Sequence, residues 1–196
     1  MKFVKENVNS AKGQEMQVTI LEEAGFKWAM RGLARSYNQN IESMPTVALK
    51  LGPKDKGHNK FLESIQVWLD IEAPRFWWSE MDTYRAGISK QSDSTIHTLS
   101  RQELTQDNFE KPIDQEYLNY LNILIRQKAS IEELKNALPD GFIQGRTVNL
   151  NYKVIRHIMI QRYNHKLSQW HVFCDAMRDL EHYELLGIDI LKPSVG

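Results

Sequence analysis

The sequence has one cysteine, Cys174, and no long apolar run. A single cysteine excludes an intramolecular disulfide framework and is typical of proteins in a reducing cytosol. A membrane-spanning helix needs about 20 consecutive apolar residues. The first residues, MKFVKENVNSAKGQ, also lack the shorter apolar stretch of a secretory signal peptide. We therefore expect a cytoplasmic protein that does not insert into a membrane.

Neither sign of charge is in excess, because 25 Lys+Arg balance 25 Asp+Glu and the formal net charge is zero. Proteins that bind polyanions are usually basic, so we expect no nucleic-acid partner. The sequence has no G-x-G-x-x-G and no P-loop pattern, which disfavours the standard dinucleotide and nucleotide folds. Zinc needs three or four convergent ligands. His171 and Cys174 with nearby His165 give too thin a basis for one, and we expect no metal site.

What is present indicates one folded domain. Hydrophobic residues make up 41% and charged residues 26%, which is ordinary for a globular protein, and the length predicts a single domain over residues 1–196. Helical periods cover residues 26–37, 74–85, 114–127, 130–137, 151–161 and 166–186. Strand-like alternation covers residues 15–21, 65–72 and 146–150. Long helices with a few strands predict an α/β or α+β layer fold.

Local signals refine these elements. Asp114 precedes its helix as an N-cap, and Ser130 with Glu133 forms a capping-box pattern. The polar stretch 89–111 shows no sustained period, which predicts a long loop of the kind that often carries function. Phe76 to Trp78 are three consecutive aromatics that one helical stripe cannot bury, which favours an oligomer.

The helix predicted over 151–161 offers a candidate binding face. Asn151 and Arg162 are separated by about 20° around an ideal helix, with Ile155 and Ile158 between them. The two polar ends could hold a planar ligand, or the stripe could be ordinary core whose ends reach solvent. Lys153, Arg156 and His157 form a separate basic stripe, which is either a solvated face or a contact for a phosphate. Cys174 is expected to be a buried apolar residue.

Four segments in order resemble the flavin-dependent thymidylate synthases, the ThyX family, over nearly the whole chain. Ala34-Arg35-Ser36-Tyr37 is similar to the family's Ala-Arg-Val-Ser-Tyr element with one residue missing. Gly57-His58-Asn59-Lys60-Phe61-Leu62-Glu63 is similar to its Gly-His-x-Ser/Thr-Pro-Phe-Glu element. The strand from Glu63 then leads to the place of the family's Arg-His-Arg signature. The last segment consists of Leu138-Pro139, Arg146, Asn151, Arg162 and Gln169-Trp170.

The chain also departs from the family pattern. The signature is Thr83-Tyr84-Arg85 here, so only its last Arg is kept, and Glu80 stands where the family has Gln. After the signature, the family has two serines followed by an Arg. When these serines are matched to Ser89 and Ser94, Ile96 stands in place of the Arg. Gaining a Glu and losing an Arg changes the local charge by about two units, which opposes binding of an anionic nucleotide.

The resemblance implies an α/β ThyX-like single domain, with a central sheet flanked by long helices, and a homotetramer that holds FAD between subunits. It implies a methyltransferase that uses NADPH and methylenetetrahydrofolate to convert dUMP, or a related pyrimidine deoxynucleotide, to dTMP. Residues carried over to the flavin site are His58, Lys60, Glu63, Tyr84, Arg85, Asn151 and His157. Residues carried over to the nucleotide site are Glu80, Ser94, Arg146 and Arg162, with Arg162 and Ser94 as catalytic residues.

Two alternatives stay open. The altered signature fits a catalytically silent descendant that uses the fold to bind a nucleotide or a protein. Because the changes gather at the substrate side rather than at His58 and Glu63, a different pyrimidine chemistry is the second alternative.

Overall fold

A four-stranded antiparallel sheet forms the centre of the molecule, in a computed structural model that describes residues 15–94, 99 and 101–188. The strand order is β1-β2-β4-β3. The bounds are β1 Gln17–Ala24, β2 Gln66–Pro74, β3 Ile88–Ser92 and β4 Ile143–Asn151. The central pair β2 and β4 matches over its full length, from Gln66 opposite Asn151 to Pro74 opposite Ile143. Alternate residues of β2 point inward, and Val67, Leu69 and Ile71 are fully buried.

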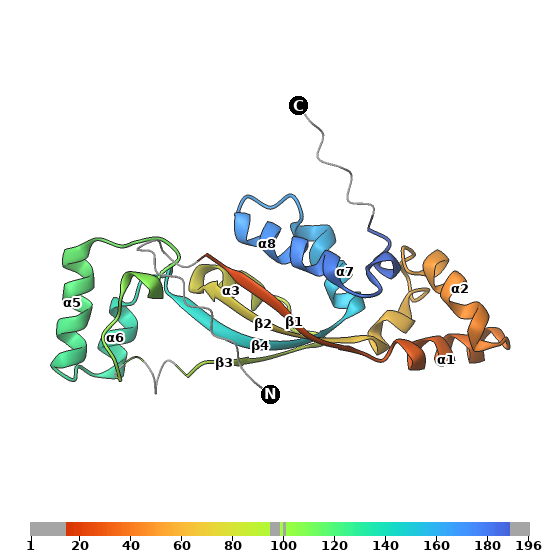
Figure 1. The fold of residues 1–196 in the computed structure, drawn as a ribbon, viewed down its shortest axis with the longest axis horizontal. Helices are drawn as coiled ribbons and strands as arrows, with labels where there is room; N and C mark the ends of the chain where they lie inside the picture. Colours follow the sequence, from red (N-terminus) through yellow and green to blue (C-terminus); the bar gives the residue numbers. More distant parts are fainter. Residues whose placement is uncertain (1–14, 95–98, 100, 189–196) are drawn as a thin grey trace, which may run out of the picture.

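Helices cover one face of the sheet and extend it at both ends (Figure 1). α7 (Tyr152–Arg162) and α8 (Ser168–Ala176) lie over the sheet, and α3 (Arg75–Met81) follows β2 directly. α1 (Phe26–Tyr37) and α2 (Met44–Leu51) lie at one end. Their inner faces join the strands in one large buried cluster, which includes Trp77, Trp170 and Phe173. We call this part the sheet body.

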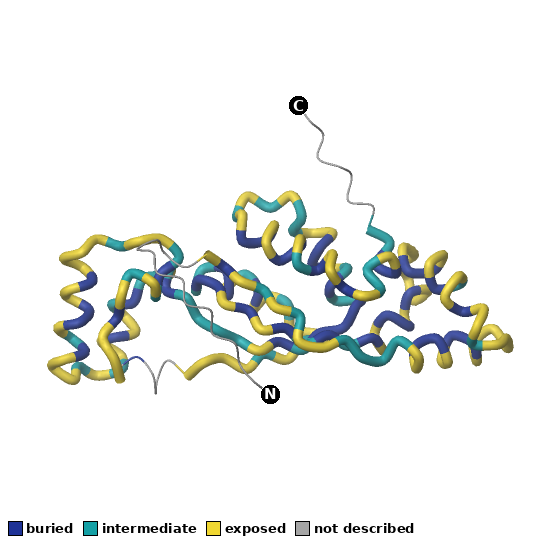
Figure 2. The backbone as a smooth tube through the Cα atoms, viewed as in Figure 1, coloured by how far each residue is buried: buried dark blue, intermediate teal, exposed yellow. Residues whose placement is uncertain are grey.

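The opposite end is a separate helical hairpin, the α5–α6 lobe, made of Leu99 and residues 101–142. The lobe buries nine hydrophobic residues, four of them on α5 (Gln115–Arg126) and α6 (Ile131–Ala137), in a cluster distinct from that of the sheet body. Figure 2 shows these buried positions along the facing sides of the hairpin. Arg75 connects the two parts, because its guanidinium donates to the Leu138 carbonyl at 2.8 Å and its amide donates to the Phe142 carbonyl.

The structure confirms the predicted fold class and most elements. The helix over 26–37 has the expected bounds, and the three predicted strands are present as β1, β2 and β4. Asp114 caps α5 by accepting from the amides of Glu116 and Tyr117, and the Ser130–Glu133 capping box is fully formed at α6. Cys174 is buried, and burial raises the pKa of its thiol to about 12. The number of domains stays a prediction.

Three predicted elements were wrong in extent. The helix predicted over 74–85 is α3, which ends at Met81. The Lys90 ammonium donates to the carbonyl oxygens of Met81 and Tyr84, and these hydrogen bonds hold the following residues in a turn. The start of the predicted loop 89–111 is the edge strand β3. The helix over 166–186 ends at Ala176 and continues as 3₁₀ turns over Met177–Asp179 and Tyr183–Leu186.

The break after α8 has a physical cause. The Glu23 carboxylate accepts from the Glu181 amide, and the Tyr152 hydroxyl accepts from the His182 amide at 3.2 Å. These amides are therefore not available for a continuous helix. Trp77 and Trp78 are both buried within one chain and Phe76 is only partly buried, and the oligomer expected from these three aromatics stays a prediction. Among the helices of the described residues, none is long and apolar enough to cross a membrane.

Candidate functional site

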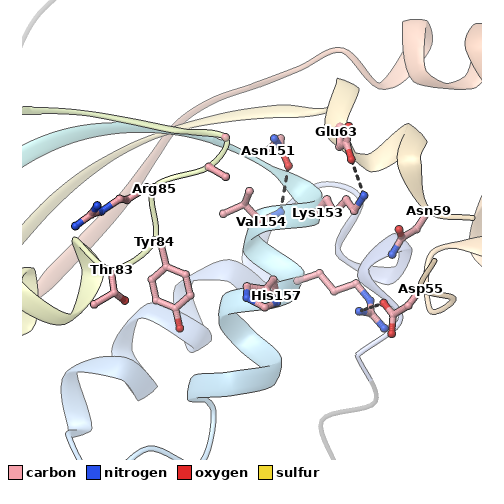
Figure 3. Close-up of a pocket in the computed structure, with 13 residues that line it drawn as sticks. Asp55, Asn59, Glu63, Thr83, Tyr84, Arg85, Asn151, Lys153, Val154 and His157 are labelled. Carbon is pink, nitrogen blue, oxygen red and sulfur yellow. Dashed lines mark hydrogen bonds and ion pairs between the residues drawn. The ribbon is translucent and has the colours of Figure 1, made fainter. Parts of the chain in front are cut away.

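A cleft of about 720 Å³ opens beside the start of α7 (Figure 3). Its volume lies in the range of small-molecule sites. Three segments form it: the region before β2, the turn after α3, and the junction of β4 with α7. The lining residues are Asp55, Asn59, Glu63, Thr83, Tyr84, Arg85, Ala86, Gly87, Asn151, Lys153, Val154, Arg156 and His157. We call it the α7 cleft.

Asn151 and Gly87 fix the inner wall of the α7 cleft. The Asn151 side-chain oxygen accepts from the Val154 amide at 3.1 Å and so caps α7. Gly87 has a φ of 72°. A Cβ at this position would lie 3.0 Å from the side-chain Nδ2 of Asn151 and 3.1 Å from a Val154 methyl group. A glycine lets the turn after α3 contact the helix start with this backbone conformation.

The α7 cleft carries more positive than negative charge. Lys153 pairs with Glu63 at 2.5 Å, and Arg156 pairs with Asp55 at 3.1 Å. Arg85 is exposed and forms no ion pair with any residue that the structure describes. Three cations therefore face two carboxylates at the N-terminus of an 11-residue helix, whose free amides also favour anions.

Asn59 supplies an unused polar atom at this cleft. Its side chain is almost completely buried, and its amide nitrogen donates to the Gly52 carbonyl at 3.3 Å. The side-chain oxygen has no hydrogen-bond partner among the residues that the structure describes. Buried polar atoms are nearly always paired, and an exception at a cleft is consistent with a missing ligand donor.

Arg162 lies in a second polar group next to the α7 cleft. Its Nε donates to the Tyr84 hydroxyl at 2.8 Å, and its Nη1 donates to Glu80 at 2.9 Å. The guanidinium lies 4.7 Å from the Trp170 ring centroid, and the Trp170 Nε1 donates to the same Glu80 oxygen at 2.8 Å. The Arg162 side chain is 18% exposed, so it does not extend into bulk water.

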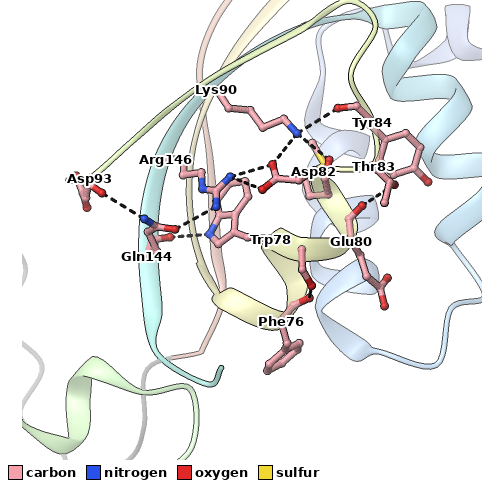
Figure 4. Close-up of polar contacts among 12 residues, drawn as sticks. Phe76, Trp78, Glu80, Asp82, Thr83, Tyr84, Lys90, Asp93, Gln144 and Arg146 are labelled. Carbon is pink, nitrogen blue, oxygen red and sulfur yellow. Dashed lines mark hydrogen bonds and ion pairs between the residues drawn. The ribbon is translucent and has the colours of Figure 1, made fainter. Parts of the chain in front are cut away.

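Arg146 lies in a third group around Asp82 (Figure 4). Its Nη1 donates to both Asp82 oxygens at 2.9 and 3.0 Å, and its guanidinium stacks on Trp78 at 4.2 Å. Lys90 donates to the same carboxylate at 2.9 Å. Burial alone would raise the pKa of Asp82, but the hydrogen bonds from Lys90 and Arg146 outweigh it and lower the pKa below 3.8.

The predicted flavin residues fall into two clefts. Five of the seven line the α7 cleft: Glu63, Tyr84, Arg85, Asn151 and His157. The other two, His58 and Lys60, line a second cleft of about 480 Å³ between η2 (Lys60–Ser64) and α1. Glu63 borders both clefts.

The predicted nucleotide residues do not lie in one group either. Glu80 and Arg162 contact each other, whereas Arg146 belongs to the separate Asp82 group. Ser94 is exposed and lines neither cleft. Ile96 lies outside the described residues.

The sequence allowed α7 to be ordinary core or to face a ligand, and its residues divide between these two environments. Ile155 and Ile158 are fully buried core residues, while Lys153, Arg156 and His157 line the cleft. Sequence reasoning missed Asp55 and Asn59, and no local pattern marks them, because their roles come from contacts with distant residues. The described residues contain no group of three or more metal-ligating side chains.

No protein-family model and no curated protein matches the sequence. Solved structures do match. The flavin-dependent thymidylate synthase ThyX from Helicobacter pylori, complexed with FAD and dUMP, matches with a TM-score of 0.76 at 16% identity, over 90% of this chain and 100% of that chain. The UMP/dUMP methylase PolB from Streptomyces cacaoi, bound with 5-Br dUMP, matches with a TM-score of 0.62 at 11% identity, over 84% and 89%. This chain therefore has the fold of ThyX.

Proposed function

We propose that the protein is a flavin-dependent enzyme that transfers and reduces a one-carbon unit onto a pyrimidine compound, with FAD bound in the α7 cleft. The main support is the convergence of Glu63, Tyr84, Arg85, Asn151 and His157 on one cleft, although they come from separate segments. Two proteins of the same fold, crystallised with FAD and dUMP or with 5-Br dUMP, are consistent with this assignment.

The residues of the α7 cleft fit FAD. Arg85, which has no ion pair with any described residue, and the N-terminus of α7 suit the two phosphates, and Lys153 lines the same cleft. Tyr84 and His157 lie edge to face, with ring centroids 6.1 Å apart, and can contact a flat ring system. The unpaired Asn59 oxygen can accept from a ring N–H or a ribityl hydroxyl. FAD would supply the redox chemistry, while the protein supplies binding and orientation.

The remaining residues have narrower proposed roles. Arg162 would orient the pyrimidine with its planar guanidinium, and Glu80 would hold Arg162 in place. Ser94 stays a proposed catalytic residue, and NADPH and methylenetetrahydrofolate stay proposed co-substrates on the strength of the sequence resemblance. His58 and Lys60 would take part in flavin binding in the homotetramer that the same resemblance implies.

The test is uptake of FAD by the purified protein, followed by its visible absorption and by size-exclusion chromatography with light scattering. We expect one FAD per chain and a tetramer. Arg85→Ala should weaken FAD binding about tenfold, the usual effect of losing one charged hydrogen bond. Arg126→Ala is the matched control, because Arg126 pairs with Glu103 in the α5–α6 lobe and should leave FAD binding unchanged. A protein that takes up no FAD would refute the proposal.

One observation favours the silent-descendant alternative: both predicted nucleotide-binding arginines, Arg146 and Arg162, are paired with carboxylates of their own chain. A non-catalytic protein would bind a pyrimidine compound without turnover. Formation of dTMP from dUMP, NADPH and methylenetetrahydrofolate would exclude this alternative.

A further inference from the structure

Arg162 is paired with a counter-ion of the same chain, Glu80. Its guanidinium pairs with Glu80 at 2.9 Å, and the same carboxylate oxygen accepts from the Trp170 indole at 2.8 Å. The His165 Nε2 lies 3.5 Å from that oxygen. The side chains of Glu80 and Arg162 are 31% and 18% exposed, so this pair is far better shielded than an ordinary surface ion pair.

Hydrogen bonds hold the pair in one arrangement. The Tyr84 hydroxyl accepts from Arg162 Nε and donates to the Gln161 side chain, both at 2.8 Å. The guanidinium also contacts two rings, with its carbon 5.5 Å from the Tyr84 centroid and 4.7 Å from that of Trp170. Rotating Arg162 toward an incoming anion would break two of these bonds and leave a shielded carboxylate without its cation.

Arg146, the other predicted nucleotide-binding cation, and the neighbouring Lys90 are engaged in the same way. Arg146 binds both oxygens of Asp82, and Lys90 binds one of them and two backbone carbonyls. Both cations are shielded, with side-chain exposures of 16% and 14%. A phosphate dianion placed beside Arg146 or Arg162 would meet a carboxylate at close range and would have to compete with it for the cation.

We propose that the pyrimidine compound bound beside Arg162 is an uncharged nucleoside, such as 2′-deoxyuridine, and that Glu80 sets this preference over the 5′-phosphorylated form. The inference rests on the proposed function for the identity of the base. A nucleoside needs hydrogen-bond partners and ring contacts rather than a free cation. The Glu80 carboxylate is 31% exposed and can accept from an N–H or O–H group, and the partly exposed Tyr84 ring provides apolar contact.

Calorimetric titration of the FAD-loaded protein with 2′-deoxyuridine and with dUMP tests this directly. We expect 2′-deoxyuridine to bind at least as tightly as dUMP. Glu80→Gln keeps the side-chain shape but removes the built-in charge, and it should shift the ratio of the two dissociation constants at least tenfold toward dUMP. Glu103→Gln breaks a Glu–Arg pair in the α5–α6 lobe by the same chemical change and should leave the ratio unaltered.

The outcomes are distinct. If the wild-type protein binds dUMP more than threefold tighter than 2′-deoxyuridine, or binds neither, the proposal is overturned. If Glu80→Gln does not fold, Glu80→Ala replaces it, because this change removes the same charge beside Arg162. A folded Glu80 variant whose ratio stays unaltered overturns the role of Glu80. If no FAD is taken up, the proposed function fails, and the same titration of the flavin-free protein still decides the nucleoside preference.

Discussion

The sheet body and the α5–α6 lobe are held together in different ways. The body joins strands and helices from distant parts of the sequence into one large cluster, and it contains every residue that lines the α7 cleft. The lobe has nine buried hydrophobic residues from one continuous stretch and contributes none to that cleft. The comparison indicates that binding depends on long-range contacts of the body, while the lobe is stabilised mainly by local contacts and caps.

The largest effect is expected at the centre of the sheet body. Trp77→Ala removes a fully buried side chain whose ring packs on Trp78, Trp170 and Phe173. We expect the free energy of unfolding to fall by about 3–5 kcal/mol, measured by urea denaturation. Trp77→Phe is the control and should cost less, because it keeps a ring and removes an indole N–H that has no partner in the described part of the chain. A loss below about 1 kcal/mol for the alanine variant would contradict this view of the core.

Leu121→Ala tests the α5–α6 lobe separately from the sheet body, because Leu121 is buried in the smaller cluster. We expect a loss of about 2–3 kcal/mol, at the lower end of the range for such changes. Hydrogen exchange should accelerate in α5 and α6 while the strands stay protected. Ile123→Ala, at an exposed position of α5, should have almost no effect. Equal acceleration in β2 and β4 would mean that lobe and body unfold as one unit.

Asp82→Asn tests the polar link between α3, β3 and β4. We expect the free energy of unfolding to fall by about 1–2 kcal/mol, because two shielded cations lose the carboxylate that pairs with them. The expected loss is smaller than for a fully buried pair, because the Asp82 side chain is 47% exposed. Since the folded-state pKa of Asp82 is below 3.8, its contribution is present above that pH and is lost as the pH falls through the lowered pKa. The stability difference between the two proteins should therefore be constant near neutral pH and shrink below about pH 4. A difference that grows on acidification would contradict the assignment.

The smallest effect is expected at the capping box of α6. Ser130→Ala removes the oxygen that accepts from the Glu133 amide at 3.2 Å. The expected loss is about 1 kcal/mol. It should be confined to the lobe and leave FAD binding unaltered. Thermal denaturation and FAD titration of the same variant measure both quantities, and weaker FAD binding would show that lobe and cleft are coupled.

Sequence patterns predicted the elements whose stability is local. The α5 and α6 helices start where Asp114 and Ser130 cap them, because capping is decided within a few residues. The end of α3 and the break after α8 were not predictable, because Lys90 and Glu23 cause them through contacts between separate segments. The edge strand β3 was missed because its residues, Ile-Ser-Lys-Gln-Ser, carry almost no apolar alternation.

The candidate site was predictable only where family motifs carry it. Glu63, Asn151 and His157 were placed by resemblance, and they share a cleft. Asp55 lies outside these motifs, and Asn59 stands at the variable position of one of them, where the motif specifies no residue type. The pairing of Arg162 with Glu80 was also beyond the sequence, because an arginine predicted to bind a nucleotide gives no sign that a carboxylate of the same chain already holds it.

The pairing of β2 with β4 has a consequence for biosynthesis. The two strands are adjacent in the sheet but are separated in the chain by α3, β3 and the whole α5–α6 lobe. A growing chain therefore exposes the unpaired edge of β2 until β4 has been made and its apolar face until α7 and α8 follow, whereas all residues of the lobe cluster precede β4. Chaperone contact is expected at the first of these segments, and ligand binding begins only after α7 has emerged.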